Sequence, residues 1–377
     1  MKIKTCRLGL FTALATASPG PAWADATPEC NVGPGSASLE CGVDSTVAST
    51  GATAVGGNAT ATGFGATALG GQLFTSIGDL PTTATGDFSV AVGSAASASG
   101  LFSTSMGTLS QATGSRTVVI GFNAEGSGNG SIAIGGPNPV STLSTIAAGT
   151  VSVAIGAGAQ TTAPALAATA IGPSALPSST GAIALGGRTQ SNAQGATALG
   201  KESLASGEFS LVAGYQGIAS GNGSIAIGHL TQSTGLIATA LGDGSLAQGN
   251  NATAIGSATV ASGLSASALG YQAVASGTAS TALGHNSGAT AIGATAVGTL
   301  ATASGESATA IGVDATASGL FSTSLGTGST SAGETSTAIG LLSSAVGARS
   351  TAVGGGAFSG GINSVSIGVQ SDAVGNG

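Results

Sequence analysis

The chain has 377 residues, of which 67 are glycine, 6% are charged and 3% are aromatic. Large side chains are too scarce for a conventional globular core, and charges are too scarce for typical disorder. The formal net charge of −7 argues against binding to nucleic acid or an anionic membrane surface, which require basic patches. A solenoid of short repeats suits this composition, because each turn needs only a thin core.

Positions 1–24 have the organisation of an export signal. A basic start is followed by a mostly apolar stretch at 8–17 and by Ala-Trp-Ala at 22–24, a small-x-small cleavage pattern. We predict cleavage after Ala24. An uncleaved anchor is the alternative, disfavoured because the apolar run is shorter than the roughly 20 residues of a membrane helix. Cleavage leaves four of the seven basic residues and all 14 acidic ones, a net charge of −10.

Residues 25–50 form a segment without repeats that contains Cys30 and Cys41. Two cysteines in an exported protein are more typical of a disulfide than of a metal site. No histidine or further cysteine lies nearby to complete a zinc site. We therefore predict a Cys30–Cys41 disulfide.

Residues 51–377 repeat with a glycine at every seventh position. Between Gly200 and Gly375 this spacing never slips, and Ala291 is the one replacement among 26 positions. Gly is about 1 kcal/mol less favourable than Ala in a helix interior, which excludes a coiled coil. The residue before each glycine alternates between a large aliphatic and a mostly polar side chain. The true repeat therefore has 14 residues in two unequal halves.

Two earlier glycine registers lie upstream, at 56–70 and at 86–156, the second with Thr142 in place of one glycine. The joins between registers, from Gly70 to Gly86 and from Gly156 to Gly172, are each two positions longer than one repeat. Such an excess is what a slightly longer turn requires. We therefore predict loops near 72–80 and 160–166.

One half-repeat, residues 252–256 (Ala-Thr-Ala-Ile-Gly), predicts a short strand followed by a glycine turn. Ala252 and Ala254 point to one side and Thr253 to the other. Two strands and two turns make one coil, and stacked coils pair their strands in parallel about 4.8 Å apart. The expected fold is all-β, a parallel solenoid of roughly 23 coils and on the order of 110 Å long.

The large aliphatic residues that precede alternate glycines form a second pattern. They do not follow the alternation of the alanines, so we expect them at the corner of each coil, facing outward. Stacked coils would align them in a stripe larger than a soluble monomer normally exposes. Such a stripe is best buried between identical chains around a symmetry axis. The interface candidates are Leu241, Ile255, Leu269, Leu283, Val297, Ile311, Leu325 and Ile339.

These repeats resemble the YadA-like head of trimeric autotransporter adhesins, whose signature is close to N-S-V-A-I-G followed by A-x-A-x-G. Residues 363–368 match with Ser366 in place of alanine, and 251–256 and 224–228 are further versions. The resemblance covers nearly all of 51–375. It implies a left-handed parallel β-roll, a homotrimer with the stripe at its centre, and exposure on the bacterial surface. Implied partners are extracellular-matrix or host-surface proteins, or identical heads on other cells.

In some members of this family the N-S-V-A-I-G motif is implicated in collagen binding. The ligand candidates by that resemblance are Asn363, Ser364, Val365, Ile367 and Gly368. We favour a structural role for them, because the roll itself requires Val and Ile there. Family members continue into a neck, a stalk and an outer-membrane anchor, whereas this sequence is still in repeat at Gly375. We expect a fragment of a longer adhesin; a released or decayed head is the alternative.

Other functions are less favoured. We expect no catalytic residue, cofactor or metal: His229 and His285 lack paired nucleophiles or carboxylates, and with Tyr215 and Tyr271 they are best interpreted as turn residues facing solvent. Ice binding is the main alternative, because threonines recur once per coil in a ladder broken by Ser267. Small β-branched residues also suit the solvent side of a strand for structural reasons alone. A secreted structural or biofilm protein is a further alternative.

Overall fold

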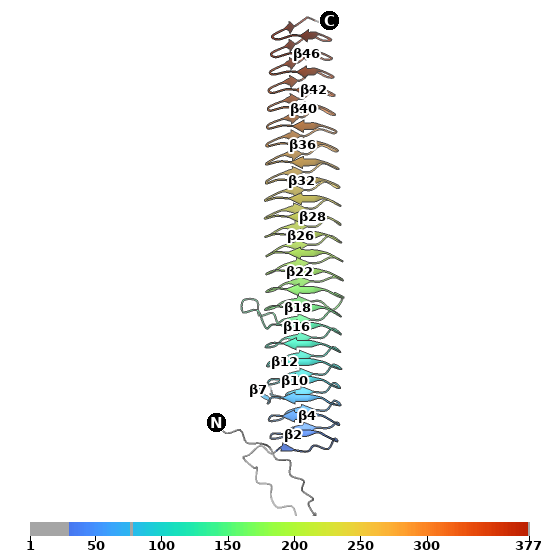
Figure 1. The fold of residues 1–377 in the computed structure, drawn as a ribbon, viewed down its shortest axis with the longest axis vertical. Helices are drawn as coiled ribbons and strands as arrows, with labels where there is room; N and C mark the ends of the chain where they lie inside the picture. Colours follow the sequence, from blue (N-terminus) through green and yellow to red (C-terminus); the bar gives the residue numbers. More distant parts are fainter. Residues whose placement is uncertain (1–29, 76–77, 376–377) are drawn as a thin grey trace, which may run out of the picture.

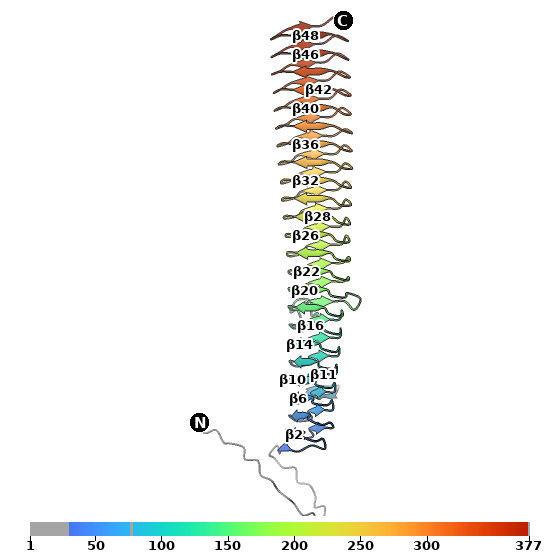
Figure 2. The same cartoon turned by 45° about the vertical axis from the view of Figure 1, so that its right-hand side comes forward.

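The computed structural model describes residues 30–75 and 78–375, so the predicted export signal at 1–24 lies outside the described residues. Every regular element in the described part is a β-strand, and the strands stack into one continuous rod (Figures 1 and 2). None of these residues belongs to a helix that could span a membrane. The prediction of an all-β parallel solenoid is confirmed.

Each coil consists of a three-residue strand, a tight turn, a two-residue strand and a second tight turn. In residues 253–266 the strands are β32 (Thr253–Ile255) and β33 (Val260–Ala261). We call the turn after the three-residue strand turn A and the turn after the two-residue strand turn B. Equivalent strands of successive coils pair in parallel, so that Thr253 lies beside Ser267. The 14-residue repeat is therefore the structural unit.

The three-residue strands form the first sheet. The two-residue strands form two shorter sheets on the opposite side of the rod. The first sheet begins with β1 (Cys30–Asn31) and continues with β2 (Leu39–Cys41), β4 (Thr53–Val55), β6 (Thr67–Leu69), β10 (Val90–Val92), β12 (Thr104–Met106), β14 (Val118–Ile120), β16 (Ile132–Ile134), β18 (Val153–Ile155), β20 (Thr169–Ile171), β22 (Ile183–Leu185), β24 (Thr197–Leu199), β26 (Leu211–Ala213), β28 (Ile225–Ile227), β30 (Thr239–Leu241), β32, β34 (Ser267–Leu269), β36 (Thr281–Leu283), β38 (Thr295–Val297), β40 (Thr309–Ile311), β42 (Thr323–Leu325), β44 (Thr337–Ile339), β46 (Thr351–Val353) and β48 (Val365–Ile367). The two-residue strands are β3 (Thr46–Val47), β5 (Thr60–Ala61), β9 (Thr83–Ala84), β11 (Ser97–Ala98), β13 (Gln111–Ala112), β15 (Glu125–Gly126), β17 (Ile146–Ala147), β19 (Gln160–Thr161), β21 (Leu176–Pro177), β23 (Gln190–Ser191), β25 (Leu204–Ala205), β27 (Ile218–Ala219), β29 (Gln232–Ser233), β31 (Leu246–Ala247), β33, β35 (Val274–Ala275), β37 (Gly288–Ala289), β39 (Thr302–Ala303), β41 (Thr316–Ala317), β43 (Thr330–Ser331), β45 (Ser344–Ala345), β47 (Phe358–Ser359) and β49 (Asp372–Ala373).

The interior contains small side chains only. Ala252, Ala254 and Ala261 are fully buried, as predicted from the alternation, and the largest fully buried side chains anywhere in the described chain are valines. A further inward position beside these alanines holds Thr259, which the sequence pattern did not single out. Its hydroxyl donates to the carbonyl of Gly270 in the next coil. Buried hydroxyls at this position are thus matched to turn carbonyls, because an unpaired one would be costly.

The two turns use glycine for different reasons. In turn A the glycine adopts a positive φ, +131° at Gly256, and an added Cβ there would also collide with the carbonyl of Gly270. In turn B no positive φ occurs at Gly263, and only the close approach of Gly277 in the next coil disfavours a side chain. The turn B position accordingly accepts a replacement such as Ala291. The positive φ that glycine tolerates is therefore used in turn A.

The first insertion is larger than predicted. Thr67 of β6 lies beside Val90 of β10, so this coil exceeds the regular repeat by nine positions and not by two. The extra residues form an antiparallel hairpin of β7 (Leu73–Thr75) and β8 (Gly78–Leu80). The loop expected near 72–80 exists, but the glycine spacing concealed its size.

The second insertion was not predicted. Ile132 of β16 lies beside Val153 of β18, so this coil contains seven extra positions, within 136–144. The assignment of Thr142 to a turn glycine position is wrong, because this residue lies in a loop that leaves the coil. An insertion of this size equals one half-repeat, so it kept the glycines at multiples of seven and resembled half of a regular coil.

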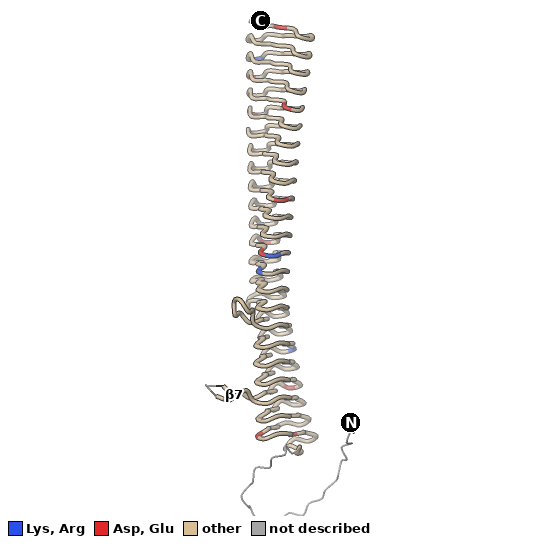
Figure 3. Tube along the Cα trace, turned by 90° about the vertical axis from the view of Figure 1, so that its left-hand side faces the viewer, with Lys and Arg blue, Asp and Glu red and all other residues tan. Residues whose placement is uncertain are grey.

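The third insertion agrees in size with the prediction. Val153 of β18 lies beside Thr169 of β20, an excess of two positions, and the irregular segment lies at 162–168, slightly after the expected 160–166. The two larger insertions both leave the rod directly after a turn A glycine, Gly70 or Gly135. They project to the same side of the rod (Figures 1 and 3).

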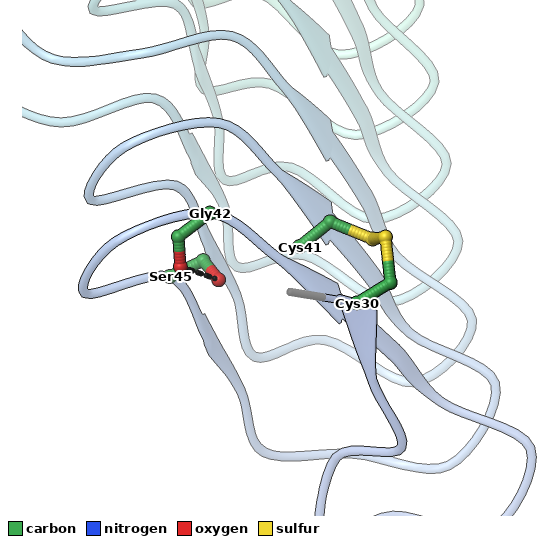
Figure 4. The surroundings of a disulfide bond; sticks show 4 residues. All are labelled: Cys30, Cys41, Gly42 and Ser45. Atoms are coloured by element: carbon green, nitrogen blue, oxygen red, sulfur yellow. Dashed lines mark hydrogen bonds between the residues drawn. A yellow bond between two sulfur atoms is a disulfide. The ribbon is translucent and has the colours of Figure 1, made fainter. Parts of the chain in front are cut away.

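The solenoid begins before the expected boundary at residue 51. Strand β2 already pairs in parallel with β4, with Leu39 beside Thr53. Strand β1 runs antiparallel to β2 and covers the outer edge of this first coil. Cys30 and Cys41 are opposite each other in that pair and form a disulfide (Figure 4). The sequence concealed this coil because Ser49 occupies a turn glycine position.

We predict that Gly256→Ala destabilises the rod more than Gly263→Ala does. A residue with Cβ at the φ of Gly256 adds strain of about 1–3 kcal/mol to the steric conflict, whereas Gly263 presents the steric conflict alone. Thermal unfolding followed by circular dichroism measures the difference. Equal losses of stability in the two variants would contradict this account of turn A.

We predict that removing the disulfide, by Cys30→Ala with Cys41→Ala, loosens only the first coils. Closing such a loop stabilises by about 3 kcal/mol, but each coil of a solenoid contacts only its neighbours. Hydrogen exchange measured by mass spectrometry should accelerate around β2 and β4 and stay unchanged around β40. Faster exchange along the whole rod would show that the coils unfold as one unit.

Candidate functional site

The aliphatic residues form a stripe on the outer face of the first sheet. In β32, Ala254 points inward, while Thr253 and Ile255 both point outward. The expectation that Ile255 sits at a corner outside the alternation is wrong: it is the last residue of the strand and alternates normally with Ala254. The expectation that it faces outward is confirmed.

The stripe runs through the rod from Val55 to Ile367, because each member lies beside its equivalent in the next coil. Its members are Val55, Leu69, Val92, Met106, Ile120, Ile134, Ile155, Ile171, Leu185, Leu199, Ala213, Ile227, Leu241, Ile255, Leu269, Leu283, Val297, Ile311, Leu325, Ile339, Val353 and Ile367. The eight interface candidates lie within it. Neither large insertion interrupts it, since both lie in turns.

The stripe is open to solvent in the single chain. Leu241, Leu269 and Leu325 expose 41%, 44% and 43% of their surface. Summed over the rod, the exposed aliphatic area is on the order of 1,000 Å², above the few hundred Å² that monomeric proteins typically expose. The stripe is therefore a candidate interaction surface.

The threonine ladder lies on the same face as the stripe. Thr253 and Ile255 are two residues apart in one strand, which places the two columns roughly 7 Å from each other. Both columns are stacked in parallel register, with Thr239 beside Thr253. Any partner that covers the stripe would therefore lie next to the threonines, so the face has no separate flat threonine surface.

The family-motif residues 363–368 divide between the core and the surface. Ser364 is buried and its hydroxyl donates to Gly361. Val365, beside Thr351 in the threonine column, is exposed by 58%, and Ile367, at the end of the stripe, is exposed by 71%. Asn363 accepts a hydrogen bond from Arg349, with Oδ1 and Nε 2.7 Å apart. Gly368 is a turn A glycine with a φ of +126°. These are the same structural positions that other coils fill.

The aromatic and histidine residues of turn A form stacked pairs. The rings of Tyr215 and His229 lie 5.6 Å apart at an interplanar angle of 8°, and Tyr271 pairs with His285 in the same way. His229 Nδ1 lies 2.7 Å from Asp243 Oδ1, so the expectation that His229 has no paired carboxylate is wrong. No group of three potential metal ligands occurs within residues 30–75 and 78–375.

A charged cluster occupies the same edge, two coils before His229. The Glu202 carboxylate accepts hydrogen bonds from Arg188 and from Gln216, the latter 2.8 Å away. The hydrogen bond from Gln216 lowers the pKa of Glu202, burial opposes this, and the nearby positive charges of Arg188 and Lys201 lower it further. Charges of both signs meet here, near the middle of an otherwise sparsely charged rod (Figure 3).

The sequence did not single out this cluster or the first half of the stripe. Arg188 lies in one turn A, and Lys201 and Glu202 lie in the turn A of the next coil. Their proximity follows from the stacking of the coils and is not visible within any single repeat. The upstream half of the stripe was not predicted, because the insertions shift the glycines there out of the register that begins at Gly200. The signal that could have found it is the aliphatic residue before every turn A glycine from Gly56 onward.

Comparison with known families assigns these repeats. The model of the YadA head domain repeat, which spans two copies, matches at 48–72, 84–110, 98–124, 112–136, 178–203, 205–231, 233–259, 261–287, 289–312, 303–329 and 331–357. Among curated protein sequences, none matches this chain. Two internal segments without a family match, 73–83 and 137–177, contain the three insertions of the rod. With repeats matched over more than half of its length, the chain belongs to the YadA head domain repeat family.

Proposed function

We propose that this rod is the head of a trimeric adhesin on the bacterial surface, formed by three copies that pack through the aliphatic stripe. The observation that carries the proposal is the continuity of the stripe from Val55 to Ile367. A core of alanine, serine and threonine contributes little hydrophobic stabilisation per coil. Burial of the stripe between chains would supply what the single chain lacks, and a closed symmetric arrangement would cover every copy of it.

The proposed role is attachment without catalysis. The rod repeats similar outer surfaces many times along its length, and three chains multiply them again. Such repetition converts weak contacts into strong attachment by avidity. The proposed partners are extracellular-matrix or host-surface proteins, or identical heads on other cells. Family membership supports an exported, surface-exposed protein of this kind.

Ice binding is the second candidate, and one observation favours it: the threonine ladder in register on the first sheet. The same observation limits it, because the ladder lies beside the stripe. A trimer packed through the stripe restricts access to this face. The two functions therefore make opposite predictions about assembly.

The first prediction concerns mass in solution. Residues 25–377 should form a β-rich species of three times the chain mass, measured by light scattering with circular dichroism. Leu269→Glu with Leu283→Glu should abolish that species, because it places two charges in a buried apolar seam. The matched control is Ser276→Glu with Thr290→Glu, which adds the same charges to exposed positions of the same two coils. A folded, stable wild-type monomer would overturn the trimer.

The second prediction concerns attachment. The intact assembly should bind to immobilised collagen or fibronectin, or to itself, with a dissociation at least 100-fold slower than that of the stripe variant, as avidity implies. Surface plasmon resonance measures both dissociation rates. Thermal hysteresis of an ice suspension, measured with the same samples, should be absent. Hysteresis together with a monomeric mass would establish the ice-binding alternative.

A further inference from the structure

The loop formed by residues 136–144 forms one wall of an open cavity at the turn A edge. The cavity has a volume of about 810 Å³. Its lining residues are Asn138, Pro139, Val140, Ser141, Ala157, Pro173, Ser174, Gly187, Arg188 and Lys201. The loop leaves the coil after Gly135 and extends over the turn A positions of the coils that follow.

The loop has a defined conformation of its own. The backbone N–H of Asn138 donates to Leu143 at 2.8 Å, and the N–H of Thr142 donates back to Asn138 at 2.8 Å. Asn138 Oδ1 accepts from the N–H of Val140 at 2.8 Å. These bonds close the loop into a compact unit, which a merely tolerated insertion does not require.

The loop is also fixed to the rod. Asn138 Nδ2 donates to Ser174 Oγ, 2.9 Å away and two coils further along. Gly158 lies beneath the loop, and a Cβ at this position would come within 2.9 Å of both the Asn138 side chain and the Leu143 carbonyl. The coil therefore holds a glycine where the loop rests on it. The far wall of the cavity is formed by Gly187, Arg188 and Lys201 of the regular turns.

The charge of the cavity wall has one sign. Arg188 and Lys201 are the charged residues that line it, and they are two of the four cations outside the predicted signal. Glu202, which bonds to Arg188 and also lies 3.8 Å from Lys201 Nζ, lines the neighbouring hollow and does not line this cavity. Each cationic side chain exposes more than half of its surface. The remaining walls are largely apolar, with Pro139, Val140 and Pro173.

We propose that this cavity binds a carboxylate attached to an apolar group. Arg188 and Lys201 would receive the carboxylate, because a guanidinium and an ammonium form charge-assisted hydrogen bonds with it. The apolar part would lie against Pro139, Val140 and Pro173. Glu202 pairs with Arg188 and lies 3.8 Å from Lys201 Nζ, so a bound carboxylate would share both cations with Glu202. This inference does not require the trimer or an adhesive role.

The test uses a matched pair of probes, N-acetyl-leucine and N-acetyl-leucinamide, which differ in the carboxylate alone. Titration calorimetry and ligand-observed NMR on residues 25–377 should detect binding of the acid and at least tenfold weaker binding of the amide, as expected for a lost charge-assisted bond. Added salt should weaken binding of the acid, because it screens partly exposed charges. Equal binding of acid and amide, or no binding of either, would overturn the proposal.

Two variants localise the binding. Arg188→Gln with Lys201→Gln should lower the affinity for N-acetyl-leucine at least tenfold, whereas Arg349→Gln, which removes a distant cation, should leave it unchanged.

Deleting 137–143 should abolish binding without disturbing the rod, because Gly135-Gly136-Ser144-Thr145 then has the length and pattern of Gly256-Ser257-Ala258-Thr259. Circular dichroism and light scattering on each variant separate loss of the cavity from loss of the fold or the assembly. Unchanged affinity after the deletion would place the ligand elsewhere and refute the cavity.

Hexanoate, a carboxylate without peptide groups, distinguishes the source of the ligand. Binding of both hexanoate and N-acetyl-leucine would support the site and assign it to small organic acids. Binding of N-acetyl-leucine alone would support the site and assign it to the carboxyl end of a polypeptide.

Discussion

The short distance between the two faces of each coil determines most of this structure. Strands of three and two residues, joined by tight turns, leave room inside for methyl and hydroxymethyl groups, and the largest fully buried side chain is valine. Every large apolar residue must therefore point outward. The stripe on the first sheet is a direct consequence of a core that cannot contain it.

The close stacking of the coils explains the glycines. Successive turns approach so closely that a Cβ at Gly256 or Gly263 would meet the backbone of the next coil. Turn A also requires a positive φ, so it excludes a side chain for two reasons. Turn B presents the steric conflict alone and accepts Ala291. At the inward position of Thr259 the side-chain hydroxyl bonds to a turn carbonyl, so polar groups at this position and the tight turns stabilise each other.

Local periodicity was enough to predict the coil, its 14-residue length, the alanine interior and the outward direction of the stripe. Each of these follows from alternation within a few residues and from the conformational needs of glycine. What periodicity could not give is any property that depends on which coil stacks on which. The loop containing Thr142 kept the glycines at multiples of seven residues, so the glycine spacing alone could not distinguish it from half of a regular coil. The cavity was not predicted for a related reason. Asn138 and Lys201 are far apart in sequence, and only the stacking of the coils brings their segments to the same edge of the rod.

The stacking of identical units also fixes how such a head can change in length. Each coil advances the rod by the spacing between paired strands, about 4.8 Å, and presents the same cross-section to the next. Gain or loss of a 14-residue unit by recombination within the repeats would therefore shift everything beyond it by one fixed increment, with no new junction to fold. The number of coils on either side of the 136–144 loop therefore sets the distance of the site beside this loop from each end of the rod.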